Sequence, residues 1–262
     1  MNEAELVLTH ILNCDKLSLY LNKDRELDKD KSALVSSILK RRITSEPLQY
    51  ILGSTEFMGL KFMVDKRALI PRPETEILVE KAIKIAAKLG WSAARPLEIL
   101  DIGTGSGCIA VSLAKNIKDC KVSATDISPQ ALELAGKNAA LHQAKIEFIQ
   151  SDLFASLSGR RFDLIVTNPP YIPTLELKSL AGEISFEPVL ALNGGQDGLD
   201  YFRRIISQSA RYLNKGGFLL MEIGFGQAGQ IENMLKKSGK FEIIEIARDY
   251  NNIERVMVSW IN

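Results

Sequence analysis

The sequence is poor in the residues that build disulfide frameworks and metal sites. Its 262 residues include only three cysteines and two histidines. Cys14, Cys108 and Cys120 are odd in number, and no two of them have the CxxC spacing typical of zinc or redox sites. His10 and His142 are isolated from each other and from the cysteines. We therefore expect free thiols in a reducing compartment, with no disulfide and no metal site.

The sequence also lacks an excess of one charge and long apolar runs. Thirty-three Lys and Arg against 32 Asp and Glu leave a net charge of +1, whereas nucleic-acid-binding proteins usually carry a clear basic excess. No apolar run approaches the roughly 18 residues of a membrane span. The first residues, with Glu3 and Glu5, lack the features of a signal peptide. We expect a cytoplasmic protein without membrane attachment or stable nucleic-acid binding.

The remaining composition, 46% hydrophobic and 25% charged, is that of an ordinary globular protein. Apolar residues at helical spacing predict helices over roughly the first 45 residues, with Asp28 or Asp30 as a possible cap. Ser45-Glu46-Pro47 predicts the cap and first turn of a short helix that ends at Gly53, and a β-hairpin follows with its turn near Gly59. We assign 1–53 to an N-terminal helical domain, 54–70 to a β-hairpin linker and 71–262 to a larger second domain.

The second domain reads as alternating helices and strands. A helix from Glu74 to Leu89, with Gly90 past its end, comes first. Only Asp249–Glu254 separates the last two strands, so these should form an antiparallel hairpin at the sheet edge, while helical crossovers make the other strands parallel. The pattern predicts an α/β fold with a seven-stranded, mostly parallel sheet. Its expected strands are Leu97–Ile102, Val122–Asp126, Ile146–Gln150, Phe162–Thr167, Phe218–Met221, Phe241–Ile246 and Arg255–Trp260, and its further helices are Cys108–Lys115, Pro129–Leu141 after Ser128, Tyr201–Leu213 and Gln227–Ser238.

A glycine-rich turn follows the first of these strands. In open α/β sheets, this strand-to-helix turn is where a nucleotide-like ligand lies, because glycines let the backbone come close and the helix N-terminus offers N–H groups. Asp126 ends the next strand and can accept hydrogen bonds from ribose hydroxyls. The segment Gly105–Ala110 also fits a dinucleotide fingerprint, whereas seven strands with an antiparallel edge favour an S-adenosyl-L-methionine enzyme. The turn consists of Gly103, Thr104, Gly105, Ser106 and Gly107.

Asn168-Pro169-Pro170-Tyr171 stands at the carboxyl end of the fourth strand. The Asn168 side-chain oxygen and the Pro169 carbonyl can accept both hydrogens of one planar –NH2 group, and Tyr171 can stack on the amide or base that carries it. Two carbonyl dipoles would stabilise the positive charge that the nitrogen gains as it attacks a methyl group, so positioning does most of the catalysis and no strong general base is needed. We predict Asn168, Pro169 and Tyr171 as catalytic residues, and all four, Pro170 included, as substrate-binding residues.

With these motifs the chain resembles the HemK/PrmC family, the N5-glutamine methyltransferases of peptide chain release factors. The run Arg72-Pro73-Glu74-Thr75-Glu76 is the most discriminating segment, because related ribosomal-protein glutamine methyltransferases differ there. DNA adenine methyltransferases share the Asn-Pro-Pro-Tyr box but not the amino-terminal block. The resemblance extends over Pro47–Gly53, Glu56-Phe57, Leu69–Glu76, Leu100–Ala110, Ser151–Phe154, Asn168–Ile172, Glu187-Pro188 and Gly194–Gly198.

The resemblance implies a Rossmann-like class I methyltransferase fold with S-adenosyl-L-methionine as cofactor. It implies that Gly103–Gly107 and Asp126 hold the methionine and ribose parts, and that Asp152 and Leu153 lie at the adenine, where some members carry Trp in place of Leu153. Asn168 would also lie near the cofactor methyl. The substrate would be the glutamine of the Gly-Gly-Gln motif in class 1 release factors, and the helical domain would help to grip that partner.

Other interpretations stay open at this point. The same –NH2 geometry suits a methyltransferase acting on adenine N6 or guanine N2 of a nucleic acid, or on a ribosomal-protein glutamine, and a cofactor-binding adaptor without catalysis is a third class. Glu222 is predicted either to orient the substrate or to make a structural hydrogen bond. Arg72 and Glu74 are predicted either to close over the pocket or to cap the long helix. The oligomeric state is open, with a monomer favoured.

Overall fold

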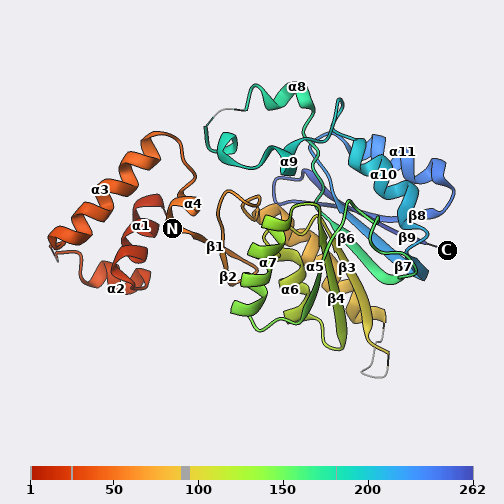
Figure 1. The fold of residues 1–262 in the computed structure, drawn as a ribbon, viewed down its shortest axis with the longest axis horizontal. Coiled ribbons are helices and arrows are strands. Elements are labelled where there is room, and N and C mark those ends of the chain that lie inside the picture. The colour runs from red at the N-terminus through yellow and green to blue at the C-terminus, as the bar shows by residue number, and fades with distance from the viewer. Residues whose placement is uncertain (1, 25, 90–94, 181, 262) are drawn as a thin grey trace.

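The computed structural model describes residues 2–24, 26–89, 95–180 and 182–261. Four helices form a small N-terminal unit beside a larger α/β unit (Figure 1). The first three begin at Asn2, Asp15 and Asp28, whose side chains each accept a hydrogen bond from a backbone N–H in the first turn. Asp28, not Asp30, is therefore the cap of the third helix. The four helices are α1 (Glu3–Leu12), α2 (Lys16–Leu21), α3 (Lys29–Ile43) and α4 (Leu48–Leu52).

The fourth helix leads into the predicted hairpin. Pro47 is the N-cap of α4, not part of its first turn as predicted, and Gly53 ends α4 in the left-handed conformation with φ 71°. Strands β1 (Ser54–Phe57) and β2 (Leu60–Met63) pair antiparallel around a turn of two residues, Met58-Gly59. Phe57 and Phe62 are buried in the core of the α/β unit, so the hairpin packs as part of that unit.

The α/β unit is built on a seven-stranded sheet of order β5-β4-β3-β6-β7-β9-β8. The first five strands in that order are parallel, and β9 is antiparallel to both β7 and β8. The predicted sheet with an antiparallel edge hairpin is confirmed. The strands are β3 (Leu97–Ile102), β4 (Cys120–Asp126), β5 (Ile146–Gln150), β6 (Phe162–Thr167), β7 (Leu213–Glu222), β8 (Phe241–Arg248) and β9 (Glu254–Ile261).

Helices cover both faces of this sheet, because successive apolar residues along a strand point to opposite sides. Ile99 packs with α5 (Pro73–Leu89), α6 (Cys108–Asn116) and α7 (Pro129–Leu141) in one core cluster. Its neighbour Leu100 packs in a second cluster with α10 (Asp200–Ser209) and α11 (Ala228–Ser238). The predicted stop of α5 at Gly90 lies outside the described residues.

The segment between β6 and β7 differs most from the prediction. It contains α8 (Thr174–Leu177), a 3₁₀ helix (Gly182–Phe186) and α9 (Val189–Leu192), none of which was predicted. The predicted helix Tyr201–Leu213 is too long, because Leu213 already pairs with Phe162 across a register shift and belongs to β7. Across the described ranges, no helix combines the length and hydrophobicity of a membrane span.

Candidate active site

The glycine-rich turn joins β3 to α6 at the carboxyl edge of the sheet. The N–H groups of Gly103 and Thr104 both donate to the Thr125 carbonyl, at 2.8 and 2.9 Å. The Asp126 carboxylate accepts from the Gly105 N–H and the Ser128 N–H, each at 2.9 Å. Burial raises the pKa of Asp126, and these backbone hydrogen bonds act against the rise. Asp126 therefore braces the glycine turn and the start of α7.

This turn borders a cavity at the carboxyl ends of β3, β4 and β6. Gly107 is the exception among the predicted cofactor-binding residues: it is the N-cap of α6, and its backbone packs against Ala135 of α7 instead of lining the cavity. The structure thus brings the separate sequence motifs to a single cavity. The predicted residues that line it are Gly103, Thr104, Gly105, Ser106, Asp126, Asp152, Leu153, Asn168, Pro169 and Pro170.

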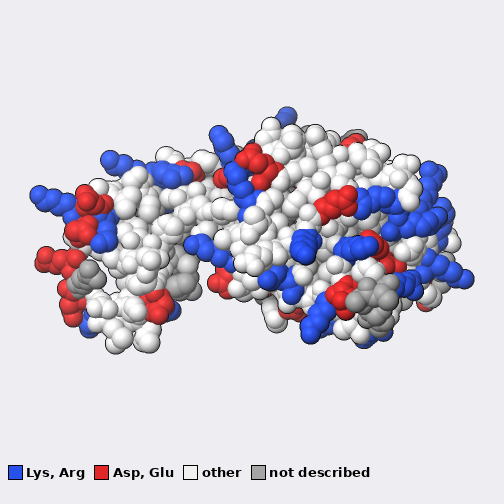
Figure 2. All heavy atoms as spheres, turned by 60° about the horizontal axis from the view of Figure 1, so that its bottom comes forward, with Lys and Arg blue, Asp and Glu red and all other residues white. Residues whose placement is uncertain are grey.

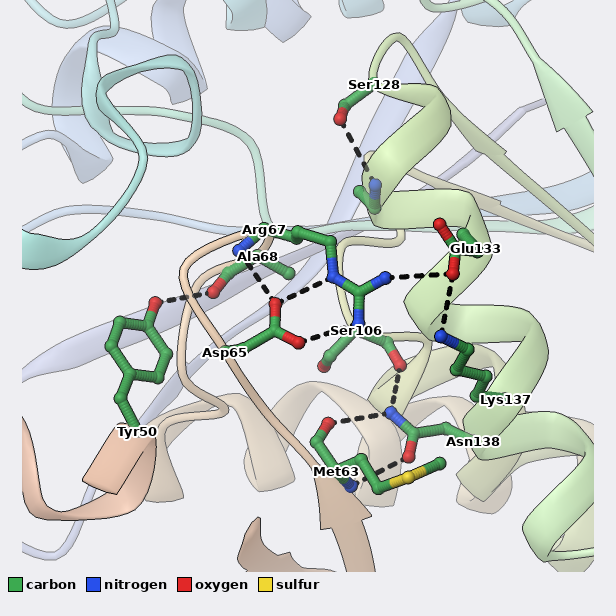
Figure 3. Close-up of polar contacts among 11 residues, drawn as sticks. Tyr50, Met63, Asp65, Arg67, Ala68, Ser106, Ser128, Glu133, Lys137 and Asn138 are labelled. Atoms are coloured by element: carbon green, nitrogen blue, oxygen red, sulfur yellow. Dashed lines mark hydrogen bonds and ion pairs between the residues drawn. The ribbon is translucent and has the colours of Figure 1, made fainter. Parts of the chain in front are cut away.

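A wall that the sequence analysis did not predict comes from the loop after β2, where Arg67, Ala68 and Leu69 line the same cavity. The Tyr50 hydroxyl donates to the Ala68 carbonyl at 2.7 Å. The Arg67 guanidinium pairs with Asp65 at 2.6 Å and with a glutamate of α7 at 3.2 Å (Figure 3). Side chains from α4 and α7 therefore hold this loop in place.

Asn138 ties the end of β2 to the glycine-rich turn. This fully buried residue of α7 accepts from the Met63 N–H at 2.8 Å (Figure 3). Its amide nitrogen donates to the Met63 carbonyl at 3.0 Å and to the Ser106 carbonyl at 2.8 Å. One side chain thus positions two cavity walls, and no local pattern in the sequence marks it for that role.

The expected adenine end of the cavity also has residues that the sequence analysis missed. Tyr201 at the start of α10 lines the cavity together with Leu153 and Asp152. The Asp152 carboxylate pairs with Arg204 of the same helix at 2.7 Å. An aromatic ring is therefore present at this end although residue 153 is leucine.

A second cavity lies beyond the Asn-Pro-Pro-Tyr box, and Asn168 and Pro169 line both cavities. Tyr171 lines only the second one. Burial, followed by the nearby Glu222 carboxylate, raises the pKa of Tyr171 to about 12, so its hydroxyl stays protonated at neutral pH. Four further charged residues, Arg72, Glu74, Glu183 and Arg255, line the second cavity with Glu222.

Arg72 lines both cavities and forms an ion pair with Glu187, whose side chain is only 1% exposed. Burial raises the pKa of Glu187, and the Arg72 charge opposes that rise. The pair ties the segment before α5 to the segment before α9, and Pro188 at the start of α9 and Leu190 within it also line the first cavity. Arg72 therefore borders both cavities, whereas Glu74 lines only the second.

The box itself is held by the segment around α9 and by α11. The Ile172 N–H donates to the Leu192 carbonyl at 3.0 Å, and the Gly194 N–H donates to the Ile172 carbonyl at 2.8 Å. Gln227 Nε2 donates to the Tyr171 carbonyl at 3.0 Å. Within the described part of the chain, no group of three or more His, Cys, Asp and Glu is placed to hold a metal ion.

Two family models match this chain. The PrmC N-terminal domain matches residues 1–53, and the Methyltransferase small domain matches residues 84–186. The chain is 43% identical over 256 residues to the release factor glutamine methyltransferase of Geobacter sulfurreducens, covering 97% of this chain and 87% of that protein. It is 36% identical to the protein of the same name from Haemophilus influenzae, covering 98% and 90% of the two chains.

Solved structures agree on the fold. The ribosomal protein L11 methylase of Lactobacillus delbrueckii subsp. bulgaricus is 25% identical with a TM-score of 0.53, over 73% of this chain and 80% of that one. A methyltransferase from Pyrococcus furiosus is 16% identical with a TM-score of 0.56, over 89% and 98%. The second likeness concerns the fold alone.

Proposed function

Because the chain belongs to the family of release factor glutamine methyltransferases, we propose that it methylates the side-chain amide nitrogen, N5, of the glutamine in the Gly-Gly-Gln motif of class 1 release factors. The methyl donor is S-adenosyl-L-methionine. One observation carries the proposal: Asn168 and Pro169 line both cavities, so an amide held by them in the second cavity faces the first.

The first cavity fits this cofactor. A Cβ on Gly103 would meet no atom within 4 Å, so the turn presents bare backbone to open space. The Asp126 carboxylate would take the ribose hydroxyls, and Leu153, Asp152 and Tyr201 would surround the adenine. When bound, the cofactor supplies an electrophilic methyl group on a sulfonium. Asn168, at the junction of the two cavities, would lie next to that methyl group.

The chain's own contribution is to hold and orient the target amide. Asn168 Oδ1 and the Pro169 carbonyl would accept its two hydrogens, and the Tyr171 ring would pack on its flat face. As the nitrogen becomes positive, these two oxygen dipoles stabilise the charge without reorganising. The prolines support this because they fix the backbone and remove two N–H donors. The Arg72–Glu187 pair holds the neighbouring segment in place at both cavities.

The N-terminal unit is proposed to grip the release factor. Arg42 of α3 pairs with Glu3 of α1 at 2.7 Å and also with Glu183 in the 3₁₀ helix. This places α3 next to the segment that borders the second cavity, where the target glutamine would enter. We retain as proposals the domain limits 1–53, 54–70 and 71–262, a cytoplasmic location and a monomeric state.

Charge favours a protein substrate over a nucleic acid. On the face drawn in Figure 2, Lys and Arg stand among Asp and Glu over the N-terminal unit and gather mainly at the far end of the α/β unit, while the chain as a whole carries a net charge of only +1. A phosphate backbone would be bound best by a continuous basic surface. The low net charge therefore favours a glutamine side chain of a protein over a nucleic-acid base as the target.

The test is transfer of label from tritiated S-adenosyl-L-methionine to a purified release factor. We expect the wild-type release factor to be labelled and a variant with Ala in place of the Gly-Gly-Gln glutamine to stay unlabelled. Equal labelling of both would refute the proposal, and labelling of RNA, DNA or a ribosomal protein instead would favour the alternatives. Asn168→Ala should abolish most turnover while leaving cofactor affinity, measured by calorimetry, largely intact.

A further inference from the structure

The side chain of Asn168 contacts residues outside the Asn-Pro-Pro-Tyr box that have so far been given no part in catalysis. Asn168 Nδ2 donates to Thr75 Oγ1 at 3.2 Å. Thr75 lies in the first turn of α5 and is 2% exposed. A hydroxyl that accepts a hydrogen bond still has its own hydrogen to donate. Thr75 can therefore pass the interaction on to a third group.

That third group is the Glu222 carboxylate at the end of β7. Glu222 is 2% exposed, and its Oε2 has no hydrogen-bond partner. Burial raises the pKa of Glu222 to about 7, and hydrogen bonds with the side chains of Thr75 and Asn168 act against that rise. The three side chains come from α5, the end of β6 and the end of β7, and they meet at the walls of the cavities: Thr75 lines the first, Glu222 the second and Asn168 both.

The orientation of an asparagine amide matters because its oxygen and nitrogen have nearly the same shape and opposite hydrogen-bonding roles. Thr75 and Glu222 both offer acceptors to the nitrogen of Asn168. With its nitrogen engaged there, Asn168 has its oxygen left to present to the cavities. In the reversed orientation, the amide nitrogen would face the –NH2 group of the target and meet it donor against donor.

Resting on the function proposed above, we propose that Thr75 and Glu222 are positioning residues that hold the Asn168 amide with Oδ1 toward the target glutamine. They act through the orientation of Asn168, with Thr75 at the wall of the first cavity and Glu222 at the wall of the second. Their loss should lower kcat and leave release factor docking and cofactor binding nearly unchanged. This separates them from residues that stabilise the fold or bind the substrate.

The experiment compares Thr75→Val, which removes the hydroxyl at nearly constant shape, with Thr75→Ser, which keeps it. We expect Thr75→Val to lower kcat about tenfold, the factor that corresponds to one ordinary hydrogen bond, with KM for the release factor and cofactor affinity within about twofold of wild type. Thr75→Ser should recover most of that loss. Glu222→Gln should also lower kcat. Ser209→Ala is the matched control, because it removes a buried hydroxyl that has no partner, at the end of α10.

A second arm places Thr75→Val in the Asn168→Ala background, with single-turnover labelling followed for hours. If Thr75 acts through Asn168, the double variant is no slower than Asn168→Ala alone. A further tenfold loss there, or full kcat in Thr75→Val alone, overturns the proposal. If Asn168→Ala gives no measurable label, the single variants decide. A wild-type protein that leaves the release factor unlabelled would instead count against the proposed function, so the two failures are distinguishable.

Discussion

Gly107→Ala tests how closely α6 approaches α7 beside the glycine-rich turn. Gly107 has φ 81°, and an added Cβ would lie 3.0 Å from the Ala135 Cβ and 3.1 Å from its Cα. The left-handed backbone costs a non-glycine residue about 1–2 kcal/mol. Overpacking against a helix backbone adds about 1–3 kcal/mol. We therefore expect Gly107→Ala to lower the free energy of unfolding by roughly 2–5 kcal/mol.

Gly103→Ala is the matched control, because Gly103 has φ 70° but its added Cβ would meet nothing within 4 Å. The free energy of unfolding of Gly103→Ala should fall only by the cost of the left-handed backbone, about 1–2 kcal/mol. Its Cβ would instead enter the open space at the cavity, so its cofactor affinity should fall. Urea unfolding followed by circular dichroism measures the stabilities, and calorimetric titration measures the affinity. Equal stabilities of the two variants would refute the close-packing argument, and wild-type affinity in Gly103→Ala would refute its place at the cofactor.

Three further perturbations have defined outcomes. Asn138→Ala leaves the buried Ser106 carbonyl and the half-buried Met63 carbonyl and N–H without their partner, so the free energy of unfolding should fall by about 3 kcal/mol; a loss below about 1 kcal/mol in urea would contradict this. Burial raises the pKa of Asp101 to about 7, so its contribution to stability is full below about pH 4 and is lost as the pH rises through 7. Asp101→Asn should flatten that decline between pH 5 and 8, and an unchanged slope would show that another group causes it. Arg72→Ala leaves the buried Glu187 carboxylate without its cation and should lower Tm, which adding Glu187→Gln should partly restore; a double variant no more stable than Arg72→Ala would count against a stabilising pair.

Helices and strands that are determined by residues adjacent in the sequence were predicted well. β3 and β6 are short apolar runs that end at turn residues, and α7 begins at Ser128 with a proline in its first turn. The box at Asn168–Tyr171 could also be located from the sequence, because its amide and prolines are consecutive residues, whereas the contact of the Asn168 amide with Thr75 could not. Errors lie where a distant partner decides: α10 ends early because Leu213 pairs with Phe162.

The sequence by itself determined the fold class and the positions of the glycine-rich turn and the Asn-Pro-Pro-Tyr box, since hydrophobic period and turn residues act over a few residues. Only the tertiary structure decided which side chains from distant parts of the sequence contact these motifs. Arg72 and Glu187 are 115 residues apart, and Asn168 and Thr75 are 93 apart. Such pairs form because the sheet brings strand ends and helix starts to one edge, and no local pattern encodes which of many polar residues will meet there.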